Sequence, residues 1–178
     1  MSRSMLALLA ASSLFAAPVP KPAETAPYFA TVVGAKWVYE RDGGREEAVE
    51  VSEVEKVDGE LVVSRTAVDG EGMRYTKMIV SAAGLRQEGV DGKVTWLLKA
   101  KLRSGESWDV PDGKRTVHGP EKVEVPAGTF TALRVEWEHA GGKLTSWYAP
   151  GVGEVKRVAK IDGDTERVTR LLKSFKAK

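Results

Sequence analysis

Residues 131–151 read TALRVEWEHAGGKLTSWYAPG, and this stretch carries the pattern that decides the fold. Within Thr131–His139, apolar side chains alternate with charged ones. The apolar members are Leu133, Val135 and Trp137. A period of two places alternate side chains on opposite faces of a β-strand, so one face is apolar and the other is hydrated. Gly141-Gly142 and Pro150-Gly151 then mark tight turns at the two ends of the following strand.

Asp-Gly pairs mark further turns along the chain, because both residues tolerate the positive φ that tight hairpin turns require. The pairs are Asp42-Gly43, Asp58-Gly59, Asp69-Gly70, Asp91-Gly92, Asp112-Gly113 and Asp162-Gly163. In Ala48–Val57 the alternation changes phase near Ser52-Glu53, which predicts a β-bulge. After residue 27, only Val168–Phe175 fits either a helix or a strand. The sequence therefore predicts an all-β chain, an antiparallel meander of about ten to twelve strands.

The second half of the chain echoes the first. A Gly-x-x-Trp motif ends at Trp37 and occurs again 71 residues later at Trp108. Val94–Lys99 reads VTWLLK and Val168–Lys173 reads VTRLLK, which agree at five of six positions. The preserved order of these matches predicts a duplication. Neither half can cover its apolar face alone, so the two similar halves would share one core as a barrel, a half-barrel or a sandwich.

The N-terminus has the three regions of a secretory signal. Arg3 supplies a positive charge, Met5–Ala17 is an apolar run, and Pro18–Pro27 is rich in proline. The apolar run is too short to span a bilayer comfortably. We therefore expect export to the periplasm or the medium, with no transmembrane span in the mature chain.

These features divide the chain into three predicted parts. Residues 1–20 are expected to form the signal peptide, residues 21–30 a Pro-rich linker, and residues 31–178 a single β domain. The halves of the duplication would cover about 31–101 and about 102–178 of that domain.

Composition excludes several classes of function. The chain has 27 basic and 25 acidic residues, interleaved rather than clustered, which argues against a nucleic-acid-binding surface. It has no cysteine, which excludes disulfides, iron–sulfur clusters, thiolate zinc sites and cysteine nucleophiles.

Three segments of the mature chain resemble motifs of a broad group of uncharacterised exported bacterial β-rich proteins. Tyr28–Glu40 is similar to the opening of that group, Val123–Ala132 reads VEVPAGTFTA, and Trp147–Lys156 reads WYAPGVGEVK. The resemblance implies an open barrel like that of the periplasmic lipoprotein carriers. The group has no established catalytic residues, so the resemblance implies none here.

Candidate chemistry is sparse. The two histidines, His118 and His139, would have to converge with carboxylates to bind a metal ion. The candidate carboxylates are Asp109, Glu121 and Glu138. Without a metal-ligand spacing, we expect surface histidines and no metal site.

Catalytic motifs are absent as well. The sequence has neither a Gly-x-Ser-x-Gly elbow nor a phosphate-binding loop. Glu136 and Glu138 share one strand face with Arg134, which is typical of a solvated ladder of charges. We expect no catalytic residue, no cofactor and no enzymatic activity.

The combination of export, a curved sheet and five tryptophans favours a binding protein. The expected ligand is apolar or amphipathic and lies within the curved sheet. The residues expected to line the ligand or form the core are Trp37, Trp108, Leu133, Val135, Trp137 and Trp147. The alternative is a structural or interaction module with a protein partner in the cell envelope.

Overall fold

The computed structural model describes residues 26–68, 74–161 and 165–178. Most of these residues form strands that follow one another through short turns, and a short 3₁₀ segment, η1 (Asp42–Gly44), connects the first two. The strands are β1 (Lys36–Arg41), β2 (Glu46–Val57), β3 (Glu60–Ala67), β4 (Arg74–Ser81), β5 (Gly84–Glu88), β6 (Val94–Lys99), β7 (Ser107–Val110), β8 (Gly113–Val125), β9 (Gly128–His139), β10 (Gly142–Ala149), β11 (Gly153–Ile161) and β12 (Arg167–Lys176). The predicted all-β meander is confirmed.

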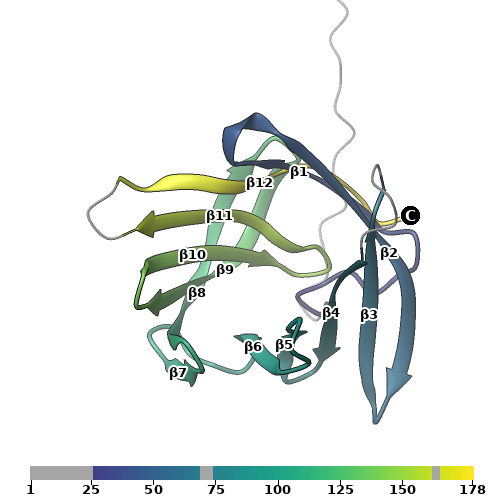
Figure 1. Cartoon of the computed structure of the whole chain (residues 1–178), viewed down its shortest axis with the longest axis horizontal. Coiled ribbons are helices and arrows are strands. Elements are labelled where there is room, and N and C mark those ends of the chain that lie inside the picture. The colour runs from purple at the N-terminus through teal and green to yellow at the C-terminus, as the bar shows by residue number, and fades with distance from the viewer. Residues whose placement is uncertain (1–25, 69–73, 162–164) are drawn as a thin grey trace, which may run out of the picture.

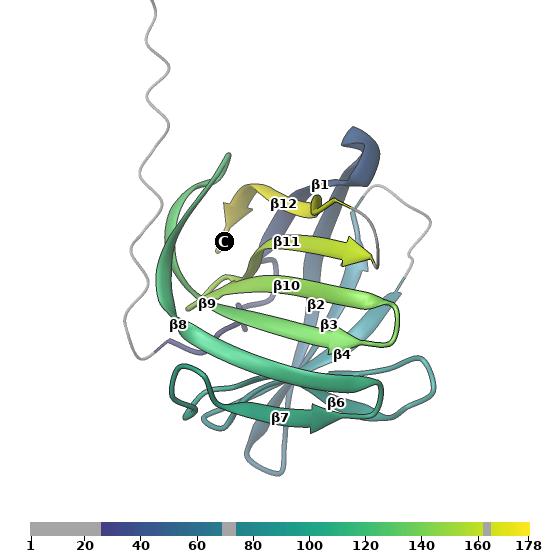
Figure 2. The same cartoon turned by 90° about the vertical axis from the view of Figure 1, so that its left-hand side faces the viewer.

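Within the described residues, the twelve strands form one antiparallel sheet in the order β6-β5-β4-β3-β2-β1-β12-β11-β10-β9-β8-β7. Strands that follow one another in the chain are neighbours in the sheet, except for β6 and β7, which form its two edges. The remaining pair, β1 with β12, joins the first and last strands of the chain. Figure 1 shows the sheet curled around a common interior, and Figure 2 shows the long β8–β9 hairpin curving along one side. Of the three shapes that the sequence left open, the chain adopts a nearly closed barrel.

The barrel has one seam, between the edge strands β6 and β7. No backbone ladder joins these two strands in the described part of the chain. Instead, the indole Nε1 of Trp108 on β7 donates a long hydrogen bond of 3.4 Å to the backbone oxygen of Trp96 on β6. Figure 1 shows β5, β6 and β7 together on the side of the barrel that faces away from β1 and β12.

Local details follow the sequence pattern. The β2–β3 ladder shifts register between Val51 and Glu53, which confirms the predicted bulge. Asp58 and Gly59 have φ angles of 49° and 83°, the left-handed conformation that a tight hairpin turn requires. The ambiguous segment Val168–Phe175 lies within β12 and is a strand. The predicted turns at Asp69-Gly70 and Asp162-Gly163 lie outside the described residues.

Each predicted half of the chain contributes six strands. β1 to β6 lie within residues 31–101 and β7 to β12 within residues 102–178, and both sets run in the same direction around the sheet. Trp37 and Trp108 both lie on the first strand of their half. The duplication itself remains a prediction, and the predicted signal peptide, residues 1–20, lies outside the described residues.

The segment that precedes β1 packs against the core. Phe29 and Ala30 are buried, although they fall at the end of the range expected to be a linker. The Phe29 ring lies 5.3 Å from that of Trp37, measured between centroids. The backbone oxygen of Pro27 accepts a 2.7 Å hydrogen bond from the amide of Gly151. The N-terminal segment therefore packs against β1 through Phe29 and is hydrogen-bonded to the turn between β10 and β11 through Pro27.

Replacing Gly153 with alanine tests the packing of Phe29 against the β10–β11 turn. The φ of Gly153 is +102°, and an added Cβ would lie 2.9 Å from Cδ2 of Phe29. Gly43 provides a matched control because its φ is +80° and an added Cβ would meet nothing within 4 Å. We expect Gly43→Ala to lower the free energy of unfolding by about 1 kcal/mol, the cost of the left-handed backbone alone, and Gly153→Ala by about 2–4 kcal/mol. Urea denaturation measures both values, and equal losses would contradict the packing of Phe29.

Candidate functional site

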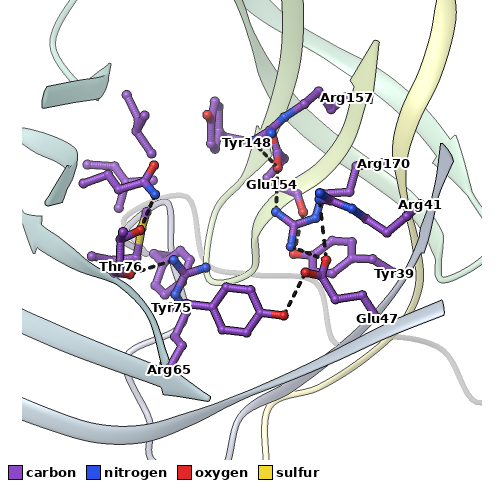
Figure 3. A pocket seen from close by; sticks show the side chains of 15 residues that line it. Tyr39, Arg41, Glu47, Arg65, Tyr75, Thr76, Tyr148, Glu154, Arg157 and Arg170 are labelled. Carbon is purple, nitrogen blue, oxygen red and sulfur yellow. Dashed lines mark hydrogen bonds and ion pairs between the residues drawn. The ribbon is translucent and has the colours of Figure 1, made fainter. Parts of the chain in front are cut away.

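A polar cavity of about 210 Å³ lies inside the barrel, lined by side chains from both halves of the chain (Figure 3). Its polar lining comes from β1 to β5 and from β10 to β12. These polar residues are Tyr39, Arg41, Glu47, Arg65, Tyr75, Thr76, Gln87, Tyr148, Glu154, Arg157 and Arg170. A barrel interior is usually filled by apolar side chains, so this concentration of charge is the feature that needs explanation.

Glu154 is the central anion of the cavity. Its side chain is buried and accepts hydrogen bonds from Nε and Nη2 of Arg157 at 2.7 and 2.8 Å, and from Nη1 of Arg170 at 3.2 Å. Burial alone would raise the pKa of this carboxyl, but the charges of Arg157 and Arg170 outweigh it and hold the pKa below its usual value. Glu154 is therefore a paired carboxylate at neutral pH.

A bulge explains how Glu154 and Arg157 face the same cavity. The β10–β11 ladder pairs Trp147 with Lys156 and Tyr148 with Glu154, which leaves Val155 as an extra residue. An extra residue reverses the alternation of faces along the strand. Side chains three positions apart, which a regular strand would place on opposite faces, therefore meet inside the barrel.

Glu47 forms a second bridge across the cavity. It accepts a 2.9 Å hydrogen bond from Nη2 of Arg170 and a 2.8 Å hydrogen bond from the hydroxyl of Tyr75. Nη1 of Arg41 lies 3.5 Å from its Oε2. Burial opposes ionisation, but these partners, Arg170 first, lower the pKa of Glu47. Arg170 thus joins the two glutamates, and its guanidinium also lies 4.0 Å from the centroid of the Tyr39 ring.

Arg65 differs from the other arginines of the cavity. Its Nη2 donates to the backbone oxygen of Thr76 at 2.9 Å, and its buried Nε has no hydrogen-bond partner among the described residues. It takes part in no ion pair with the carboxylates that the structure describes, and the rings of Phe29 and Tyr75 lie 5.5 and 5.6 Å from its guanidinium. Burial, followed by the charge of Arg170, lowers the pKa of Arg65 to about 10. The side chain is still a cation at neutral pH.

The cavity therefore carries an excess of positive charge. Four arginines and two glutamates line it, which leaves two positive charges uncompensated by its own lining. Arginine presents a planar fork of donors that matches a carboxylate or phosphate group. The other three guanidiniums are paired with Glu47 or Glu154, so among the described residues Arg65 is the cavity arginine without an ion pair. Chemically, this arrangement can bind an anion.

The six residues expected to line a ligand or form the core occupy different surroundings. Trp37, Trp108 and Val135 are buried in the core, and Leu133 is partly buried against it. Trp137 lies beside a second cavity, described below, while Trp147 donates from Nε1 to the exposed carboxylate of Glu121 at 2.6 Å. None of the six lines the polar cavity, and their role in ligand binding remains a prediction.

Sequence reasoning missed the charged lining, although a signal for it exists. Arg65 is two residues from buried Val63, Arg157 two residues from buried Val155, and Arg170 two residues from buried Leu172. In a strand, a spacing of two places both side chains on the same face. Charged residues two positions away from core residues in the same strand are thus the pattern that predicts a polar interior.

The two histidines lie apart. Nε2 of His118 is 3.4 Å from Oε2 of Glu136, and Nδ1 of His139 accepts a hydrogen bond from the amide of Gly141 at 3.1 Å. Among the residues that the structure describes, no three His, Asp or Glu side chains are placed to hold a metal ion. Glu136 also lies 4.0 Å from Arg134 and 3.5 Å from Lys143, as a ladder of charges on the sheet face would require.

Comparison with known proteins identifies a shared fold. No family model and no curated protein matches the sequence. Two crystal structures match in three dimensions. A candidate exported protein of Bacteroides fragilis with a YmcC-like fold has a TM-score of 0.62 at 15% identity over 85% of this chain and 99% of its own. A candidate lipoprotein of Parabacteroides distasonis has a TM-score of 0.59 at 16% identity over 86% of this chain and 100% of its own.

At these identities the likeness establishes the barrel fold, which is the YmcC-like fold of the first neighbour. The membership suggested by the sequence motifs remains a prediction. In the described ranges, no helix is long and apolar enough to cross a bilayer.

Proposed function

We propose that this chain is an exported, non-enzymatic binding protein whose barrel interior holds an amphipathic ligand by an anionic group. The observation that carries the proposal is the guanidinium of Arg65, which lines the cavity without an ionic partner among the described residues. A buried cation with unmet hydrogen-bonding capacity destabilises a fold. The position of Arg65 is explained if an anionic group of the ligand is its ionic partner.

The rest of the lining supports an amphipathic ligand rather than a purely apolar one. Phe29, Met78, Leu85 and Leu97 line the same cavity as the arginines. A ligand with an oxyanion and an adjoining hydrocarbon chain would satisfy both kinds of surface. The cavity of about 210 Å³ is smaller than typical pockets for whole drug-sized ligands, so we expect it to receive the charged end of the molecule.

Export rests on two supports of different kinds. The N-terminal segment contains a positive charge at Arg3, then an apolar run and a Pro-rich stretch. The two structural neighbours are named as candidate exported protein and candidate lipoprotein. We propose a location in the periplasm or outside the cell, where a barrel of this kind would hold or carry its ligand.

Replacing Arg65 with methionine tests the proposal. The probe is dodecanoate, with dodecanol as its uncharged counterpart, and binding is measured by isothermal titration calorimetry. We expect wild-type protein to bind dodecanoate more tightly than dodecanol, and Arg65→Met to weaken dodecanoate binding about 10- to 100-fold, the effect of one charge-assisted hydrogen-bonding partner. Binding of dodecanol should not change.

Arg167→Met is the matched control, since Arg167 is an exposed arginine that lies 3.3 Å from Asp42 and is not among the residues that line the cavity. It should bind dodecanoate like the wild type. Arg65→Met should also be at least as stable as the wild type, because the substitution removes a buried cation without orphaning a carboxylate. Equal affinity for the two probes, no saturable binding, or an unchanged affinity in Arg65→Met would refute the proposal and favour an interaction module.

A further inference from the structure

A second cavity, of about 280 Å³, lies beside the seam of the barrel. It is bounded by β5, β6, the β7–β8 turn, β8 and β9. Its lining includes Gln87, Leu97, Val110, Asp112, Arg115 and Trp137. Asp112 is exposed on the β7–β8 turn and forms no ion pair with Arg115 among the described residues. Gln87 and Leu97 also line the polar cavity, so the two cavities adjoin within one interior.

Among the described residues, Arg115 is the arginine that lines this second cavity, with 7% of its surface exposed. Its Nε is buried without a hydrogen-bond partner among the described residues, and it joins none of the ion pairs found there. The guanidinium lies 4.8 Å from the centroid of the Trp137 ring. Stacking on an indole stabilises a guanidinium but satisfies none of its donors.

Trp137 presents a second unmet donor. Its Nε1 is also buried without a hydrogen-bond partner in the described part of the chain. Buried donors are satisfied in the great majority of native structures, so two unsatisfied donors on stacked side chains need an explanation. An oxyanion in the cavity would offer acceptor lone pairs to both and would compensate the charge of Arg115.

We infer that Arg115 and Trp137 form a second anion subsite, and that the ligand carries two acidic groups separated by a hydrocarbon chain. One group would meet Arg65 in the polar cavity, the other would meet Arg115 and Trp137, and the chain would pass the shared side chain of Leu97. The shared chemistry of the second group is an oxyanion, a carboxylate or a phosphate. This inference rests on the proposed function and specifies its class of ligand.

The test compares ligands with one and two acidic groups on the same chain. The probes are dodecanoate, the alkanedioates from hexanedioate to dodecanedioate, and the corresponding ω-phosphooxy alkanoates. We expect at least one doubly acidic probe to bind about tenfold more tightly than dodecanoate. A gain in affinity among the alkanedioates would identify the second group as a carboxylate, and a gain among the ω-phosphooxy alkanoates would identify it as a phosphate. Arg115→Met should abolish the gain, so that the doubly acidic probes bind this variant no more tightly than dodecanoate does.

Trp137→Phe keeps a smaller aromatic face for Arg115 and removes the indole donor, so it should reduce the gain partially. It also keeps the test decisive if Arg115→Met does not fold. Arg167→Met should behave like the wild type with every probe. A wild-type protein that binds dodecanoate through Arg65 but prefers no doubly acidic probe would overturn the second subsite alone. If the wild-type protein binds none of the probes, the proposed function itself is overturned.

Discussion

Replacing Glu154 with glutamine should lower the free energy of unfolding by about 3–5 kcal/mol, the typical effect of removing one member of a buried ion cluster. The carboxylate is 7% exposed and accepts three hydrogen bonds from Arg157 and Arg170. The neutral amide leaves Arg157 without its only carboxylate partner among the described residues. Chemical denaturation of both proteins at neutral pH measures the difference.

The pH dependence of stability is the second measurement for this variant. The folded state lowers the pKa of Glu154, so its contribution to stability is present above the unfolded pKa of about 4.5 and is lost as the pH falls through the lower folded pKa. Wild-type protein should therefore lose stability below about pH 4.5, and Glu154→Gln should lose less over the same range. Glu121→Gln changes an exposed carboxylate and should resemble the wild type. If the free energy of unfolding depends on pH in the same way in the wild type and in Glu154→Gln, the ion pairs of Glu154 with its arginines do not stabilise its charged form.

Trp37→Ala should destabilise the barrel by about 3–5 kcal/mol, as expected for the loss of a large buried aromatic side chain. Trp37 is 1% exposed, and its Nε1 donates a 2.9 Å hydrogen bond to the backbone oxygen of Val152. Its ring lies 5.3 Å from Phe29 and 5.6 Å from Phe175. One side chain therefore joins the N-terminal segment, the β10–β11 turn and the last strand. Thermal and urea unfolding give the change in stability.

Two further variants separate the contributions of Trp37. Trp37→Phe removes the hydrogen bond while keeping most of the apolar area, so we expect a loss of about 1–3 kcal/mol. Trp147→Ala is the control for removing a tryptophan, because Trp147 is only partly buried and its indole bonds to the exposed Glu121. A loss in Trp147→Ala as large as that in Trp37→Ala would contradict the central position of Trp37.

The fold could be predicted because its determinants are local. Alternation in Thr131–His139 marks β9, and the phase change near Ser52 marks the bulge that β2 contains. Turn residues such as Asp58-Gly59 then separate one strand from the next. An antiparallel meander needs little more information than this, because each strand pairs with its neighbour in the chain. The pairing of β1 with β12, which curls the sheet into a barrel, joins residues that no local pattern relates.

The polar cavity could not be predicted by the same reasoning. The alternation rule assigns charged side chains to the hydrated face, and this is correct for Arg134 and Glu136. It fails for Arg170 and Arg65, which share the inward face with core residues. It also fails for Glu154, because the bulge at Val155 changes which side chains face inward. Bulge positions within a charged segment leave no apolar pattern by which they can be located, so the inward position of Glu154 becomes visible only in three dimensions.

The seam between β6 and β7 has a consequence for access to the interior. Separating any other two neighbouring strands breaks a ladder of backbone hydrogen bonds. Between β6 and β7 the described part of the chain has no such ladder, and separating them breaks the hydrogen bond from the indole of Trp108 to the backbone oxygen of Trp96. The cavity that contains Arg115 lies against these strands. This side of the barrel can therefore widen while the rest of the sheet stays paired, and we expect the ligand proposed above to enter here, one end first.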